Sequence, residues 1–140
     1  MNNINSPKSK QMNIEVKTYD IDFAGHVNNI AYVRCIEDLR AELFSEIYPL
    51  KKLLEINHYP VVISTELNYK APIKLFDKPI GIISLEKYSH GVIELKVEIF
   101  NDKVTAFTAV QKCVLMNLTT NKMFMGDLDK LLGSYNVKTK

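Results

Sequence analysis

The chain has 140 residues, of which 46% are hydrophobic and 24% charged, and its formal net charge at pH 7 is +2. This length fits one domain that buries about two-thirds of the surface of its unfolded chain, with no room for a second catalytic domain. The small positive charge, without a basic run interleaved with aromatic residues, excludes a typical nucleic-acid-binding surface.

The two ends of the chain differ in composition from its middle. Residues 1–11 are polar and show no hydrophobic period, so we expect a flexible tail there, then a single domain over residues 12–132 and a polar tail over residues 133–140. The first eleven residues also lack the apolar core of a signal peptide, and no apolar stretch is long enough to span a bilayer. A cytoplasmic protein is the resulting expectation.

The first half of the chain predicts a strand and a long helix. The strand covers residues 12–19, where Met12, Ile14 and Val16 alternate with polar residues. The helix covers residues 30–48, because apolar residues recur there at intervals of three and four. Its apolar stripe comprises Tyr32, Cys35, Ile36, Leu39, Leu43 and Ile47, and a second apolar side comprises Ile30, Val33, Ala41 and Phe44. Glu37 projects into that second side, so it is either an exposed residue at its edge or a carboxylate held against a partner surface.

The second half of the chain predicts four more strands. They cover residues 61–70, 79–88, 92–100 and 104–118, with turns at residues 89–91 and 101–103. Residues 51–57 form a charged connection, and residues 126–132 have room for one turn of helix. One strand, one long helix and four further strands predict an α+β fold, in which a five-stranded antiparallel sheet covers one long helix.

A polar run separates the first strand from the long helix, with the sequence YDIDFAGHVNNIAY over residues 19–32. It contains Asp20, Asp22, Gly25, His26, Asn28 and Asn29. The run therefore lies at a helix N-terminus, which offers free backbone N–H groups and a partial positive charge. Asn28 or Asn29 is suited to cap the helix, because a short side-chain oxygen reaches the first free amides. Each residue alone is more often a turn residue than a catalytic one, so it is their joint occurrence that indicates a site.

The string from Asp22 to Asn29, followed by Tyr32 and Glu37, resembles the D-x-x-G-H-V-N-N-x-x-Y-x-x-x-x-E signature of hot-dog-fold thioesterases. These are the 4-hydroxybenzoyl-CoA thioesterase-like and acyl-ACP thioesterase-like families, and the order of predicted elements matches their plan over residues 12–118. The resemblance implies a hot-dog fold, in which the sheet wraps around the long central helix. It also implies an enzyme that hydrolyses acyl-CoA or acyl-carrier-protein thioesters to a carboxylic acid and a thiol.

The same resemblance implies roles for individual residues. Asp22 would be the catalytic carboxylate, acting as nucleophile or general base, while a backbone N–H near Asn29 polarises the thioester carbonyl. His26 would bind the substrate or orient the loop, and Glu37 would lie at the active site. The implied substrate-binding positions are Gly25, Val27, Asn28, Asn29 and Tyr32. The chain departs from plant acyl-ACP thioesterases at Ala24, where those enzymes have an asparagine, so a mechanism that requires this asparagine is not expected.

The resemblance further implies a homodimer or homotetramer, in which the catalytic aspartate of one chain faces the long helix of another. Neither a metal nor a cofactor is expected, since Cys35 and Cys113 lack the spacing of a zinc site or a disulfide framework and are predicted to be buried thiols. His58 and His90 stand alone in predicted loops, and no G-x-S-x-G or H-E-x-x-H motif occurs.

Two other functions stay open, each within a hot-dog fold. One is a non-catalytic acyl-CoA-binding or regulatory module, which would normally lack the acid, so the presence of Asp22 argues against it. The other is a dehydratase or hydratase. Such an enzyme needs its own pair of a histidine and an acid, and the G-H-V-N-N run does not resemble that pair.

Overall fold

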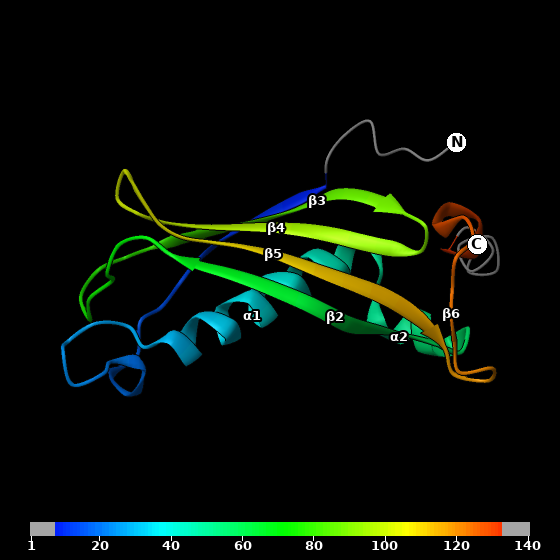
Figure 1. The fold of residues 1–140 in the computed structure, drawn as a ribbon, viewed down its shortest axis with the longest axis horizontal. Coiled ribbons are helices and arrows are strands. Elements are labelled where there is room, and N and C mark those ends of the chain that lie inside the picture. The colour runs from blue at the N-terminus through cyan, green and yellow to red at the C-terminus, as the bar shows by residue number, and fades with distance from the viewer. Residues whose placement is uncertain (1–7, 133–140) are drawn as a thin grey trace.

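The computed structural model describes residues 8–132 (Figure 1). The polar tail expected over residues 133–140 lies outside the described residues, as does the expected N-terminal tail up to residue 7. The described elements are β1 (Ser9–Asn13), the 3-10 helix η1 (Thr18–Asp20), α1 (Asn29–Ile47), α2 (Leu50–Glu55), β2 (His58–Tyr69), β3 (Ile80–Ser89), β4 (Val92–Asn101), β5 (Val104–Asn117) and β6 (Lys122–Met123). Residues 128–132 are also helical.

The strands form one antiparallel sheet with α1 on one face. The strand order is β1-β3-β4-β5-β2, and the two-residue β6 pairs with β5. Figure 1 shows the long strands arched over α1, which runs beneath them. The predicted arrangement of a long helix covered by an antiparallel sheet is therefore confirmed, with β6 as a sixth, short strand that the sequence did not predict.

Helix α1 packs tightly against β3 at a glycine. The predicted stripe residues Ile36, Leu39 and Leu43 are buried against the sheet. A Cβ placed on Gly81 of β3 would lie 2.8 Å from Ile14 Cδ1 and 3.0 Å from Leu39 Cδ1. Because real Cβ atoms do not approach so closely, the absence of a side chain at Gly81 lets the helix approach the sheet.

The sheet has an exposed edge at β2. This strand pairs with β5 on one side and is the last in the strand order, so its other row of backbone groups is unpaired within the described chain. Apolar side chains of β2 are also open to solvent, namely Tyr59, Val61, Val62, Ile63 and Tyr69. An edge of this kind is a template for pairing with another strand.

The prediction for the first strand was wrong in its position. Strand β1 covers residues 9–13, residues 14–17 have no regular secondary structure, and residues 18–20 form η1. The inward-facing row of β1 begins with Lys10, which is half-buried like Met12. A lysine buries its hydrocarbon stem while its charge stays in water, so a hydrophobicity pattern places the start of such a strand too late.

Two other local predictions were also wrong. The charged connection over residues 51–57 contains α2, whose Leu53 is fully buried, and six residues are too few to show a helical period. His58 is not in a loop but begins β2, where it is buried, with Nδ1 2.7 Å from the Ile56 carbonyl oxygen. Separately, the second apolar side predicted for the long helix is partly open to solvent, since its residues Ile30 and Val33 are 75% and 40% exposed.

None of the helices within residues 8–132 is long and apolar enough to cross a membrane.

Candidate active site

Asp22 lies in a tight turn that fixes one of its carboxylate oxygens. Oδ1 accepts hydrogen bonds from the backbone amides of Ala24 at 2.9 Å and His26 at 3.1 Å. The amide of Gly25 donates to the Asp22 carbonyl at 3.0 Å, and Gly25 has a φ of +84°, a conformation that favours glycine. Within residues 8–132 no hydrogen bond reaches Asp22 Oδ2, so this oxygen of an exposed carboxylate is available to a substrate or water.

Helix α1 begins directly after this turn, with Asn28 as its N-cap. Asn28 Oδ1 accepts a hydrogen bond from the amide of Ala31 at 2.9 Å, so Asn28, rather than Asn29, is the cap. The amides of Asn29 and Ile30 lie in the same first turn and have no acceptor within the helix. They add N–H donors and the positive end of the helix dipole beside the Asp22 turn.

The Asp22 turn and the start of α1 line one surface pocket of about 290 Å³. Five predicted site residues line this pocket: Asp22, His26, Val27, Asn29 and Tyr32. Tyr32 is buried, and its ring stacks on Phe107 with the ring centroids 4.5 Å apart. Burial raises the pKa of the Tyr32 hydroxyl to about 12, so this residue is a neutral aromatic wall at physiological pH.

The rest of the pocket lining comes from residues that the sequence analysis missed, Tyr69, Lys70, Ala71 and Pro72. They meet the Asp22 turn because the amide of Val27 donates to the Ile73 carbonyl at 2.7 Å and His26 is bridged to Lys74 in antiparallel fashion. The dipeptide Ala71-Pro72 marks the end of β2 in the sequence, but no local pattern shows which distant segment the chain then joins.

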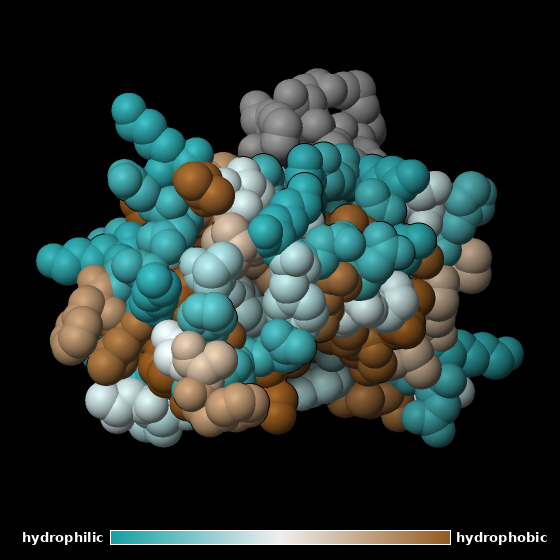
Figure 2. Space-filling view, turned by 60° about the vertical axis from the view of Figure 1, so that its left-hand side comes forward, coloured by the Kyte–Doolittle hydropathy of each residue, from teal (hydrophilic) through white to brown (hydrophobic). Residues whose placement is uncertain are grey.

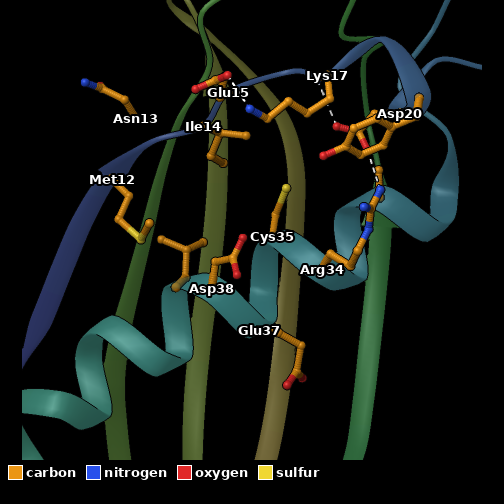
Figure 3. A pocket seen from close by; sticks show the side chains of 13 residues that line it. Met12, Asn13, Ile14, Glu15, Lys17, Asp20, Arg34, Cys35, Glu37 and Asp38 are labelled. Carbon is orange, nitrogen blue, oxygen red and sulfur yellow. Dashed lines mark hydrogen bonds and ion pairs between the residues drawn. The ribbon is translucent and has the colours of Figure 1, made fainter.

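Asp20, the other carboxylate of the run, is held inside the protein. It is 8% exposed, and its carboxylate forms an ion pair with the guanidinium of Arg34 (Figure 3). Asp20 Oδ2 also accepts the amide of Lys17 at 3.0 Å, and the Asp20 carbonyl accepts the amide of Asn28 at 2.8 Å. Asp20 therefore ties η1, the N-cap and the second turn of α1 together.

Glu37 does not line the Asp22 pocket within one chain. It lines a separate cavity of about 370 Å³ between the β1–η1 segment and α1, which is drawn in Figure 3. Its Oε2 accepts a hydrogen bond from Arg40 Nη1 at 2.7 Å, and the same nitrogen donates to Oε1 of the buried Gln111 at 2.6 Å. Gln111 Nε2 donates in turn to Thr65 Oγ1 at 3.1 Å, so a polar chain runs from α1 through β5 to the edge strand β2.

Both cysteines are free thiols, Cys113 buried and Cys35 half-buried. Burial raises the pKa of each thiol to about 11, so neither is a ready nucleophile near neutral pH. No cluster of three or more His, Cys, Asp or Glu side chains suited to a metal ion occurs in the part of the chain that the structure describes.

A family model described as the thioesterase-like superfamily matches residues 16–130, and the chain belongs to that superfamily. No curated protein sequence matches the chain. The fold is similar to that of a DHNA-CoA thioesterase from Staphylococcus aureus, with a TM-score of 0.74 and 21% identity, covering 95% of this chain and 90% of that one.

Two further solved structures are similar to this chain. An acyl-ACP thioesterase from Bacteroides thetaiotaomicron has a TM-score of 0.79 and 14% identity, covering 85% of this chain and 50% of that one. A hypothetical protein from Staphylococcus aureus, solved in complex with CoA, has a TM-score of 0.77 and 13% identity, covering 93% of this chain and 84% of that one. The fold is thus the hot-dog fold, as the resemblance implied.

Proposed function

We propose that this protein hydrolyses acyl thioesters in the pocket lined by Asp22 and His26. The observation that carries this proposal is the position of Asp22, which presents one free carboxylate oxygen beside the first amides of α1. A carboxylate and nearby N–H donors are the two kinds of group that acyl transfer needs.

In this mechanism the thioester carbonyl oxygen receives hydrogen bonds from the amides of Asn29 and Ile30. Asp22 Oδ2 either attacks the carbonyl carbon itself or takes a proton from a water molecule whose oxygen attacks. The tetrahedral oxyanion then collapses and expels the thiolate. In the first case water hydrolyses the resulting anhydride, and in the second the proton taken by Asp22 passes to the thiolate.

The remaining pocket residues position the substrate. The ring of His26 and the aromatic side chains of Tyr32 and Tyr69 surround the space next to Asp22. Gly25 leaves room for a close approach of substrate to the turn, because nothing lies within 4 Å of where its Cβ would be. Holding the reacting carbon at the correct distance from Asp22 is the contribution expected of these groups.

The proposal includes a second copy of the chain. Strand β2 offers an edge that no other strand of residues 8–132 pairs with, and it has exposed apolar side chains, to which Ile30 and Val33 of α1 add. Figure 2 shows hydrophobic side chains open to solvent among hydrophilic ones on one face of the molecule. Pairing two copies along β2 would cover these side chains and bring the helix that carries Glu37 toward the partner's pocket.

The experiment is a panel of aliphatic and aromatic acyl-CoA thioesters and one acyl-carrier-protein, assayed by release of free thiol. The proposal expects turnover of at least one of them well above the uncatalysed rate. If none is hydrolysed while a thioester binds tightly, the protein is a binding module and the proposal is wrong. The substrates of two relatives guide the panel, since their names specify a CoA thioester and an acyl-ACP.

A further inference from the structure

Residues 70–78, which form all but the last residue of the link between β2 and β3, lie beside the Asp22 turn. The amide of Val27 donates to the Ile73 carbonyl at 2.7 Å, and His26 and Lys74 form an antiparallel bridge. The segment begins with Lys70 in the wall of the Asp22 pocket. It ends with Lys78 in the wall of another cavity, of about 610 Å³, which Leu75 and Phe76 also line.

This segment carries three exposed lysines and one acid, a net charge of 3 − 1 = +2. Within residues 8–132, the ion pairs involve Lys10, Lys17, Arg34 and Arg40, and none involves Lys70, Lys74 or Lys78. No carboxylate of the described chain forms an ion pair with any of the three ammonium groups, although the charge of Lys74 is the smallest of the causes that lower the pKa of Asp77.

The one acid of the segment, Asp77, accepts hydrogen bonds from a backbone amide and a side-chain amide. Its Oδ2 accepts the amide of Lys74 at 2.8 Å and the side-chain amide of Asn101 at 2.9 Å. These hydrogen bonds lower the pKa of the Asp77 carboxyl, the first being the larger cause. Asp77 thus shapes the turn that presents the lysines.

We infer that residues 70–78 bind the phosphate groups of the substrate's carrier, through Lys74 and Lys78. This inference rests on the proposed hydrolysis in the Asp22 pocket. Lys70 lines the Asp22 pocket, Lys74 is bridged to His26, and Lys78 lines the second cavity. The three lysines therefore follow one another from the pocket to the second cavity. Unpaired lysines spaced along a surface are suited to phosphate oxygens, which they bind as point charges.

Two carriers of acyl groups as thioesters contain phosphate. Coenzyme A has a pyrophosphate and a 3′-phosphate with an adenine, whereas a carrier protein has a single phosphodiester on its pantetheine arm. The cavity at Lys78 contains Phe76, which is 90% exposed, and a planar base can stack on such a ring.

The test compares thioesters of one acyl group on three thiols, namely pantetheine, 4′-phosphopantetheine and CoA. We expect Lys74→Ala with Lys78→Ala to lower the ratio of kcat/KM for the CoA thioester to that for the pantetheine thioester about tenfold, since each exposed ion pair contributes up to about fivefold. A fall already present with 4′-phosphopantetheine assigns the contact to the phosphate that both carriers share. A fall confined to CoA assigns it to the nucleotide phosphates.

The matched control is Lys122→Ala, an exposed lysine in β6 at the other end of the molecule (Figure 1), for which the ratio should stay at the wild-type value. An unchanged ratio in the double variant would overturn the inference while leaving the proposed hydrolysis intact. If the wild type hydrolyses none of the three thioesters, calorimetric titration with CoA still tests whether Lys74 and Lys78 bind its phosphates. The inference expects a Kd about tenfold higher for the double variant, and equal Kd values would contradict it.

Discussion

The Asp20 carboxylate and the Arg34 guanidinium, 14 residues apart in sequence, form an ion pair that joins the segment before the Asp22 turn to helix α1. Asp20 is buried, whereas the Arg34 side chain is 52% exposed. The pair fixes the segment from which the turn projects, because the Asp20 carbonyl also accepts the amide of the N-cap Asn28.

Removing the arginine should therefore destabilise the fold. Among residues 8–132, Arg34→Met leaves the buried Asp20 carboxylate with only the Lys17 amide as a partner, and we expect the free energy of unfolding to fall by about 1–2 kcal/mol. Urea unfolding measures this change. Adding Asp20→Asn to the variant should recover part of the loss, and strictly additive effects of the two substitutions would show that the residues do not interact.

The second prediction concerns Glu37, which lies apart from Asp22 within one chain. Glu37→Gln keeps the shape of the side chain but removes the charge that pairs with Arg40, so Arg40 and Gln111 lose part of their orientation. We expect kcat to fall by about tenfold or less, a smaller loss than for a variant of Asp22. Steady-state thiol release measures kcat for Glu37→Gln and for Asp22→Asn. A loss in Glu37→Gln as severe as that in Asp22→Asn would contradict the roles assigned to the two carboxylates.

The long helix and the strand alternation of this fold could be predicted from the sequence because each depends on a local period. The helix over residues 30–48 and the four later strands occur as predicted, within a few residues at their ends. Helix α2 and β1 are too short, or too rich in lysine, to show their period clearly.

The candidate site could be predicted in part for the same reason. The Asp22 turn and the Asn28 cap are local features, and the sequence run places them together. The wall of Tyr69, Lys70 and Pro72 depends on pairing between segments more than 40 residues apart, such as His26 with Lys74, and no local pattern specifies that pairing.

The third prediction is that the protein is at least a dimer. The exposed edge and apolar surface of β2 should lead two copies to pair, and the sequence does not choose between dimer and tetramer. Light scattering at micromolar concentration should give at least twice the 16.0 kDa chain mass. Ile63→Lys places a charge in the middle of β2 and should shift the protein toward monomer, with Lys112→Ala on the neighbouring β5 as a control. A wild-type monomer that is fully active at that concentration would rule out a shared site.

The fourth prediction is a pH dependence of stability from the thiol of Cys113. Burial raises its pKa to about 11, whereas the pKa of a thiol in the unfolded chain is about 8.5. Between these values the folded protein retains a proton that the unfolded chain has lost, so stability is full below about pH 8.5 and falls as the pH rises toward about 11. Urea unfolding under reducing conditions at pH 8 and pH 10.5 should show a steeper fall for the wild type than for Cys113→Ala. Parallel falls would show that this thiol does not contribute.

The most direct test of the proposed function is the turnover of Asp22→Asn on whichever thioester the wild type hydrolyses best. The substitution keeps the side-chain oxygen that accepts the amides of Ala24 and His26, so the turn should stay folded, but it removes the carboxylate that attacks or activates water. Asp38→Asn, the same change at an exposed position of α1, is the control. We predict that kcat falls by about 100-fold or more for Asp22→Asn, with an unchanged unfolding midpoint, and stays near the wild-type value for Asp38→Asn. Near-wild-type hydrolysis by a correctly folded Asp22→Asn variant would contradict the assignment of Asp22 as the catalytic carboxylate.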